Sequence, residues 1–165
     1  MTADELIDGM IGAGRPFSSR EYTIVPNVSW GWGLDYEADI IAISPAGTVN
    51  EIEVKVRQQD LLNDVRKRKW GCGLDPRVKR FWYAVPPGLA ALALEIRPDP
   101  RINPGVLVVR APDRLGEDHD VKIARPAKAI QGARQATPSE VQELSRLGLL
   151  RYWDLRVKRW ATIPT

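Results

Sequence analysis

The chain has one cysteine and one histidine in 165 residues, and this scarcity limits the chemistry available to it. The single cysteine, Cys72, excludes an internal disulfide and any zinc cluster built on cysteines, as is typical of proteins of the reducing cytoplasm. The single histidine, His119, disfavours mechanisms that need a histidine pair, a His–Cys pair or a histidine metal cluster. Because His119 lies in a polar stretch, we expect its imidazole to be solvated.

Long hydrophobic runs are also absent from the sequence. No apolar stretch approaches the roughly 18 residues that a membrane span needs, and no hydrophobic segment follows basic residues at the N-terminus. We therefore expect neither membrane insertion nor secretion, and we predict a cytoplasmic location. A length of 165 residues predicts a single domain, 1–165, with a substantial core.

Hydrophobic periodicity and turn residues divide the chain into helices and strands, which predicts an α/β fold. The expected helices share an apolar stripe, and they cover residues 2–11, 58–70, 89–96 and about 138–160. The last of these begins with the capping box Thr137-Pro138-Ser139-Glu140 and is basic. The expected strands are rich in β-branched and aromatic residues, and they cover residues 21–30, 39–43, 49–57, 80–85, 106–109 and 121–124.

A predicted hairpin carries the residues most suited to catalysis. The turn Ser44-Pro45-Ala46-Gly47 separates an apolar run that begins at Asp39 from a strictly alternating segment. If the turn is centred on Ala46, then Ile41 faces Glu51 and Asp39 faces Glu53. The alternation places Lys55 on the same face as Glu53, so two carboxylates and an ammonium group converge. A shift of one residue would send Asp39 to the other face.

Two carboxylates this close repel each other unless a cation lies between them. Oxygen ligands without histidine or cysteine suit a hard ion, so we predict that Asp39 and Glu53 bind Mg²⁺ or Mn²⁺. Such an ion generates hydroxide from water, and Lys55 would orient that water or neutralise charge on the phosphorus oxygens. Glu37 and Glu51 are reserve ligands. Glu5 lies on the polar side of the first expected helix and could approach the site, although an exposed position without a role is the alternative we prefer.

A structural alternative remains open at this point. Glu51, Glu53, Lys55 and Arg57 would also form the solvated face of an amphipathic strand, and a Glu-x-Lys triplet alone carries little information. The catalytic interpretation is favoured over this alternative because four features occur together: an isolated Asp39, a short turn, the Glu-x-Lys triplet and a basic helix.

Positive charge is concentrated directly after the triplet. Residues 55–80 contain nine basic and three acidic side chains, although the whole chain carries a net charge of only +3. Such a patch indicates a polyanionic partner, and a solvated helix face is the alternative. In the helix expected at 58–70, Leu61, Leu62 and Val65 should face inward. The predicted contacts to DNA phosphates are Gln59, Arg66, Lys67, Arg68 and Lys69.

Two further features leave alternatives open. Trp30 and Trp32 would either stack on bases or pack in the core, which we slightly prefer. The basic residues of the C-terminal helix would either contact phosphates or face solvent on a docking helix; they are Arg151, Arg156, Lys158 and Arg159.

The order of these elements resembles the core of the PD-(D/E)xK nuclease superfamily. Asp39, Glu53 and Lys55 match its motif, although Ala38 replaces the proline that gives the motif its name. More closely, the chain resembles the MmcB-type DNA-repair family over residues 35–125. The matching segments are EADIIAI, EIEVK, the Asp60 and Asp64 helix ending in KW, FWYAVPPG, GVLVV and VKIARPA.

The resemblance implies a restriction-endonuclease-like mixed β-sheet flanked by helices, a Mg²⁺-type cofactor and a DNA substrate. It implies a Mg²⁺-dependent deoxyribonuclease acting in DNA repair or processing, and a homodimer is among the arrangements that such nucleases adopt. Some members of the superfamily have lost catalysis, so a silent DNA-binding module or a repair-complex subunit is the alternative. A third possibility is a structural or protein-interaction domain whose basic patch binds an acidic protein.

Overall fold

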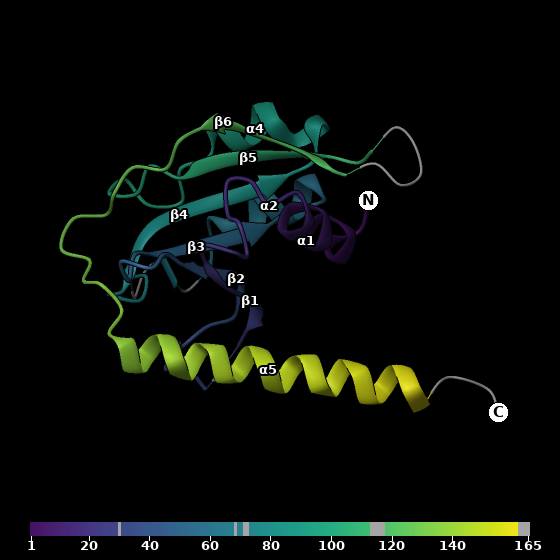
Figure 1. Cartoon of the computed structure of the whole chain (residues 1–165). Coiled ribbons are helices and arrows are strands. Elements are labelled where there is room, and N and C mark those ends of the chain that lie inside the picture. Colours follow the sequence, from purple (N-terminus) through teal and green to yellow (C-terminus); the bar gives the residue numbers. More distant parts are fainter. Residues whose placement is uncertain (30, 68, 71–72, 113–117, 162–165) are drawn as a thin grey trace.

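The computed structural model describes residues 1–29, 31–67, 69–70, 73–112 and 118–161, with the backbone alone from residue 154 onward. Six strands in this part of the chain form one sheet, in which each strand lies beside its neighbours in sequence (Figure 1). The strands are β1 (Thr23–Val28), β2 (Ala38–Ile43), β3 (Val49–Val54), β4 (Val78–Val85), β5 (Gly105–Arg110) and β6 (Asp120–Arg125).

The sheet mixes antiparallel and parallel pairs. β1, β2 and β3 are antiparallel neighbours, β3, β4 and β5 run parallel, and β6 returns antiparallel to β5. Parallel neighbours need a crossover connection, and helices supply it: α2 (Gln58–Asp64) precedes β4, while η1 (Pro87–Leu89) and α4 (Ala90–Glu95) precede β5. The molecule therefore has an α/β fold, consistent with the predicted restriction-endonuclease-like mixed sheet flanked by helices.

Helices cover both faces of the sheet and bury its central strands. On one face, Leu6 and Met10 of α1 (Ala3–Gly12) pack against Ile40, Ile52 and Trp82. On the other face, a second cluster forms under α2 and α4. Its buried members are Leu61, Trp70, Phe81, Tyr83, Val85, Ala93, Ile96, Ile102 and Val106. As a result, every residue of β3 is buried. Strands enclosed on both faces are usually apolar throughout, so the glutamates within β3 are unusual.

The C-terminal helix α5 (Pro138–Ala161) lies beside β1 and extends past the sheet (Figure 1). The predicted capping box is confirmed, because the Thr137 N–H donates to Glu140 Oε2 and the Glu140 N–H donates to Thr137 Oγ1. Arg151 donates to the carbonyl of Pro26 and to Ser29 Oγ, so this basic residue docks the helix. The other basic residues considered there, 156, 158 and 159, lie outside the described side chains.

The helix expected at 58–70 is interrupted. α2 ends at Asp64, and a turn redirects the chain before residues 69–70 become helical again. The prediction that Leu62 and Val65 face inward is wrong, since each is 38 % exposed, while Leu61 is buried as expected. The inward face of α2 carries Leu61 and Asp64, so the next residue, Leu62, points away from the sheet, and Val65 lies at the C-cap, beyond the end of the helix.

Two other sequence predictions concern burial. Trp32 is buried and donates its indole N–H to the carbonyl of Glu140, so packing, and not base stacking, is its role in this fold. Trp30 lies outside the described residues. Across the described part of the chain, we find no helix with the length and apolar character needed to span a membrane.

Candidate functional site

The hairpin of β2 and β3 adopts the predicted register. Ile41 pairs with Glu51 and Ile40 pairs with Ile52, while the Ser44 N–H donates to the carbonyl of Thr48 at the turn. Continued by one residue, this register brings Asp39 opposite Glu53. Asp39 Oδ2 accepts a hydrogen bond of 2.7 Å from the Val54 N–H, which ties the aspartate to the end of β3.

The charged face of β3 points into the protein. Glu51, Glu53 and Lys55 are 0 %, 1 % and 6 % exposed. The alternative of a solvated amphipathic strand is therefore wrong for these three residues, because the segment 58–70 covers this face of β3. Arg57, at the N-cap of α2, is exposed and is the one member of the predicted face that reaches solvent.

Lys55 brings the predicted catalytic residues together. Its ammonium group forms a hydrogen-bonded ion pair with Glu53 Oε2 and lies 3.6 Å from Asp39 Oδ2. The predicted convergence of these three side chains is confirmed by these contacts. A third carboxylate oxygen, Asp64 Oδ1, lies 3.5 Å from the same Nζ atom.

Lys69 is the buried counterion of Glu51 and Glu53. Its Nζ atom lies 2.5 Å from Glu53 Oε1 and 3.1 Å from Glu51 Oε1, and its side chain is 2 % exposed. The rings of Tyr36, Trp70 and Phe81 lie within 5.4 Å of the ammonium group, which adds cation–π attraction in a desolvated site. The expectation that Lys69 lies on the surface is wrong, because it is the internal counterion of two glutamates.

Lys67 covers the cluster on its solvent side. Its Nζ atom lies 2.8 Å from Asp64 Oδ1 and 3.2 Å from Glu53 Oε2, and its side chain is 45 % exposed. Together these contacts define what we call the ion cluster: Asp39, Glu51, Glu53, Lys55, Asp64, Lys67 and Lys69. Four carboxylates thus face three ammonium groups, which leaves one negative charge in excess if all are ionised.

The electrostatic environment differs between the carboxylates. Burial raises the pKa of Glu53, but the ammonium groups of Lys69, Lys55 and Lys67 together outweigh it and lower this pKa to about 2. Burial raises the pKa of Asp39, and the charge of Glu53 raises it further despite the opposing effect of Lys55. Burial likewise raises the pKa of Glu51. Asp39 is therefore the poorly compensated carboxylate at the exposed edge of the cluster, with a side chain 30 % exposed.

The donor chemistry of the cluster suits a hard divalent cation. Carboxylate oxygens of Asp39, Glu53 and Asp64 surround one ammonium group, and oxygen ligands are those that Mg²⁺ and Mn²⁺ prefer. As the side chains stand, however, the described residues contain no group of three or more His, Cys, Asp or Glu arranged to hold a metal ion. Both oxygens of Glu53 contact ammonium groups. A divalent cation would therefore have to displace the half-exposed Lys67.

The reserve ligands and Glu5 have other partners or other positions. Glu5 completes the capping box of α1 with Thr2. Glu37 is exposed just before β2. Glu51 accepts a hydrogen bond of 2.6 Å from the Tyr36 hydroxyl in addition to its ion pair with Lys69.

The residues predicted to contact DNA differ in their exposure to solvent. Gln59 and Arg66 are exposed, and Gln59 also donates to Asn63 Oδ1 on the same helix. Lys67 is half-exposed, Lys69 is buried, and Arg68 lies outside the described residues. The surface patch is therefore smaller than the sequence count indicates, since Lys55 and Arg77 are also buried in ion pairs.

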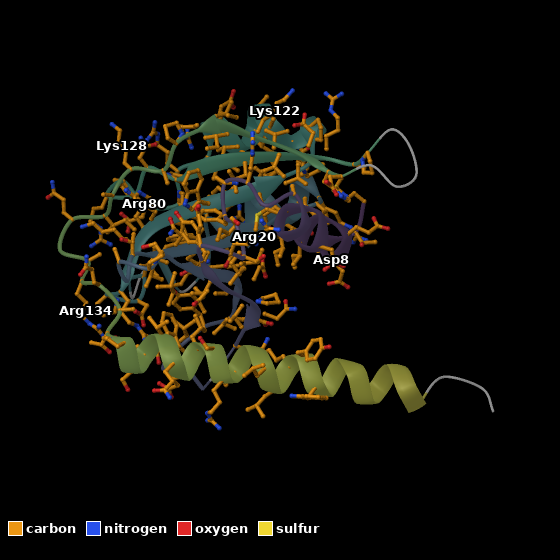
Figure 2. All side chains as sticks on the ribbon, viewed as in Figure 1. Asp8, Arg20, Arg80, Lys122, Lys128 and Arg134 are labelled. Atoms are coloured by element: carbon orange, nitrogen blue, oxygen red, sulfur yellow. The ribbon has the colours of Figure 1, made fainter. Side chains whose placement is uncertain are left out.

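Basic side chains also lie outside the segment 58–70, and one of them, Arg134, is paired with a carboxylate. Figure 2 shows Arg80, Lys128 and Arg134 on the side of the molecule from which the chain enters α5. A groove of about 1040 Å³ on this side contains Arg134 and reaches the ion cluster at Lys69. Arg134 pairs with Glu140 at 2.5 Å, and Lys69 is already paired, so these cations are not available to bind a phosphate without breaking an ion pair.

Comparisons with known proteins support the fold alone. The sequence matches no protein-family profile and no curated protein. The structure is similar to that of a protein of unknown function from Silicibacter pomeroyi, with a TM-score of 0.57 and 16 % sequence identity. The match covers 98 % of this chain and 93 % of the other, so the similarity extends over both chains almost completely.

Three members of the site are not predicted by the sequence pattern. They are Asp64, its hydrogen-bond donor Tyr83, and Tyr36, which donates to Glu51. One signal was available for Asp64: it follows Leu61 by three residues, so it shares the inward face of the helix. A carboxylate on an inward face needs a cationic partner.

Proposed function

We propose that this protein is a metal-dependent nuclease that hydrolyses phosphodiester bonds in DNA. The observation that supports this function is the meeting of Asp39, Glu53 and Lys55 at adjoining ends of β2 and β3. Four carboxylates and three lysines in one largely buried cluster are costly for stability, since each buried charge loses hydration. Clusters of buried charged groups with shifted pKa values are typical of catalytic and binding sites. The resemblance to the PD-(D/E)xK superfamily and its MmcB-type family supports the same function.

In this proposal, Asp39 and Glu53 would hold Mg²⁺ or Mn²⁺ once Lys67 withdraws. Such an ion would supply Lewis-acid chemistry at this place in the cluster. Lys55 orients the attacking water and neutralises charge on the phosphorus oxygens. The water oxygen would form a bond to phosphorus while the attacking water gives one proton to bulk water. The phosphorus–oxygen ester bond would then break, and the leaving oxygen would take up a proton from bulk water.

The DNA backbone would approach the cluster from its solvent side. Gln59 and Arg66 are exposed on the segment that covers the cluster, and Lys67 would contact a phosphate once released from Glu53. A function on DNA also agrees with the predicted cytoplasmic location.

The test is cleavage of plasmid, linear, branched and single-stranded DNA in Mg²⁺ or Mn²⁺. We expect cleavage that excess chelator abolishes and that Asp39→Ala or Lys55→Ala reduces by at least about a hundredfold. Lys122→Ala is the matched control, because Lys122 is 73 % exposed on β6 and pairs with Asp120 outside the cluster. Cleavage that persists in both cluster variants, or in chelator, would exclude this assignment.

A catalytically silent DNA-binding module is the second candidate. It is favoured by the contacts of Glu53, because its two carboxylate oxygens are already paired with three ammonium groups and neither is free to bind a metal ion. For this candidate we expect an electrophoretic shift that survives chelation and falls steeply with salt, with no products from any of the substrates. Failure to bind DNA even at low salt would instead favour a protein-interaction domain.

A further inference from the structure

Asp64 is a buried carboxylate that the proposed chemistry does not yet use. It is the last residue of α2 and is 0 % exposed, although it faces the active-site lysine. Burying a carboxylate destabilises a protein strongly unless cations and hydrogen bonds compensate for the lost hydration. An apolar residue at this position would fill the same space without that cost.

Aromatic side chains fix Asp64 from the protein side. The Tyr83 hydroxyl donates a hydrogen bond of 2.7 Å to Asp64 Oδ2, and the Trp70 indole N–H donates to the Asp64 carbonyl over 2.5 Å. Burial raises the pKa of Tyr83, and the charge of Asp64 raises it further, so the hydroxyl keeps its proton and remains a donor. With Oδ2 held by Tyr83, Oδ1 points at the ammonium groups of Lys67 and Lys55, 2.8 Å and 3.5 Å away.

Lys55 needs such a partner to hold its position. Its side chain is a flexible four-carbon chain that ends in an ammonium group with three N–H donors, so the ammonium group has no fixed position of its own. Three carboxylates from different elements surround that group: Asp39 of β2, Glu53 of β3 and Asp64 of α2. Asp39 and Glu53 lie on adjacent strands, so Asp64 supplies the contact from the helix that covers them.

We propose that Asp64, held by Tyr83, is a positioning residue that keeps the Lys55 ammonium group in the gap between Asp39 and Glu53. This inference rests on the proposed function of the same site. It assigns to the end of α2 the task of orienting the lysine that acts on the scissile phosphate, while Asp64 itself touches neither water nor DNA.

The first test compares Asp64→Asn with Asp60→Asn in the cleavage assay. Asp60 is exposed on the same helix and serves as the matched control. We expect Asp64→Asn to lower kcat by about a hundredfold because Lys55 loses its geometry, with KM for DNA unchanged within about twofold. We expect Asp60→Asn to leave both constants unchanged. An unchanged kcat in folded Asp64→Asn would overturn the proposal.

The second test does not depend on cleavage. Proton–nitrogen NMR spectra of the lysine ammonium groups should contain a slowly exchanging Lys55 signal, assigned by its loss in Lys55→Arg. We expect this signal to broaden or shift in Asp64→Asn and to stay unchanged in Asp60→Asn. A Lys55 signal identical in Asp64→Asn and wild type would overturn the positioning role.

The two tests separate the two proposals. A wild-type protein that cleaves none of the substrates contradicts the nuclease function, and the NMR comparison then still decides the role of Asp64. If Asp64→Asn does not fold, Tyr83→Phe takes its place, because it removes the hydrogen bond and keeps the charge. In that variant, a Lys55 signal and a kcat both equal to wild type would overturn the inference.

Discussion

The backbone N–H of Val54 donates a hydrogen bond of 2.7 Å to Oδ2 of Asp39. The side chain of Asp39 thus takes the place of a backbone acceptor where the pairing of β2 and β3 ends. One carboxylate oxygen is fixed, while the side chain remains 30 % exposed. The contact explains how Asp39 stays at the edge of the ion cluster although its charge is poorly compensated there.

We predict that Asp39→Asn stabilises the protein slightly while it removes divalent-cation binding. The amide oxygen can still accept from Val54, and the substitution removes a charge that burial and Glu53 disfavour, as the raised pKa of Asp39 shows. We expect the thermal midpoint at pH 7 to rise, by no more than about 4 °C.

Calorimetry over a pH series checks the sign of this effect. The advantage of Asp39→Asn should shrink as the pH falls through the raised pKa of Asp39, because the wild-type side chain then also becomes neutral. A variant that unfolds at a lower temperature than wild type at pH 7 would contradict this prediction.

Glu53 should give the protein an acid-labile component of stability. Its pKa is about 2 in the folded protein against a reference value of 4.5, because three ammonium groups surround it. A depressed carboxylate pKa contributes stability that is complete above about pH 4.5 and is lost as the pH falls toward about 2.

Urea unfolding of wild type and Glu53→Gln tests this window. At pH 7 we expect the variant to lose roughly 3 kcal/mol of unfolding free energy, since three ammonium groups lose their shared anion. The difference between the two proteins should decrease below about pH 4.5. A difference independent of pH would indicate that packing, and not charge, is responsible.

Lys69 should be the most important lysine of the cluster for stability. Its side chain is 2 % exposed and compensates both Glu51 and Glu53. Replacing it by methionine leaves two buried carboxylates short of a cation, so we expect Lys69→Met to cost about 3–5 kcal/mol. Lys122→Met removes an exposed ion pair on β6 and should cost no more than about 1 kcal/mol. Equal unfolding free energies for the two variants would contradict the internal role of Lys69.

The hairpin was predictable from local pattern because its determinants are local. A turn with Pro45 and Gly47 fixed the centre, and strict alternation then fixed which side chains share a face with Glu53. The same holds for the capping box at Thr137, whose two partners are three residues apart. The six strands and their α/β arrangement follow from similar signals.

The burial of the lysines was not predictable, because it depends on contacts between distant segments. A run of four basic residues on a predicted helix reads as a solvated face, yet the break after Asp64 turns Lys69 inward toward Glu51, 18 residues earlier. Leu62 lies inside α2 beside the buried Leu61 and faces solvent, and Val65, the C-cap residue of α2, is exposed as well. The break has no local sequence signal, since α2 ends without glycine or proline. Of the rings around Lys69, Trp70 is its neighbour in the sequence, but Tyr36 and Phe81 come from distant segments.

Lys67 should compete with a divalent cation for the cluster. Its ammonium group is 2.8 Å from Asp64 Oδ1 and 3.2 Å from Glu53 Oε2, so it covers a Glu53 oxygen that the proposed metal ion would use. Because its side chain is 45 % exposed, against 7 % for Lys55 and 2 % for Lys69, Lys67 can move into solvent at a smaller loss of packing than either. We therefore expect Lys67→Met to bind Mn²⁺ at least about tenfold more tightly than wild type, since one competing positive charge is removed.

Arg66→Met is the control that separates this competition from a general effect of charge. Arg66 is the exposed neighbour of Lys67, so both variants change the net charge of the chain equally. Titration with Mn²⁺, followed by electron paramagnetic resonance at moderate salt, should show tighter binding in Lys67→Met alone, because exposed charges are screened over about 10 Å at 0.1 M salt. Equal affinity in both variants would mean that Lys67 does not occupy the cation position. Tighter binding with unchanged or slower cleavage would show that Lys67, once released, also acts on the DNA.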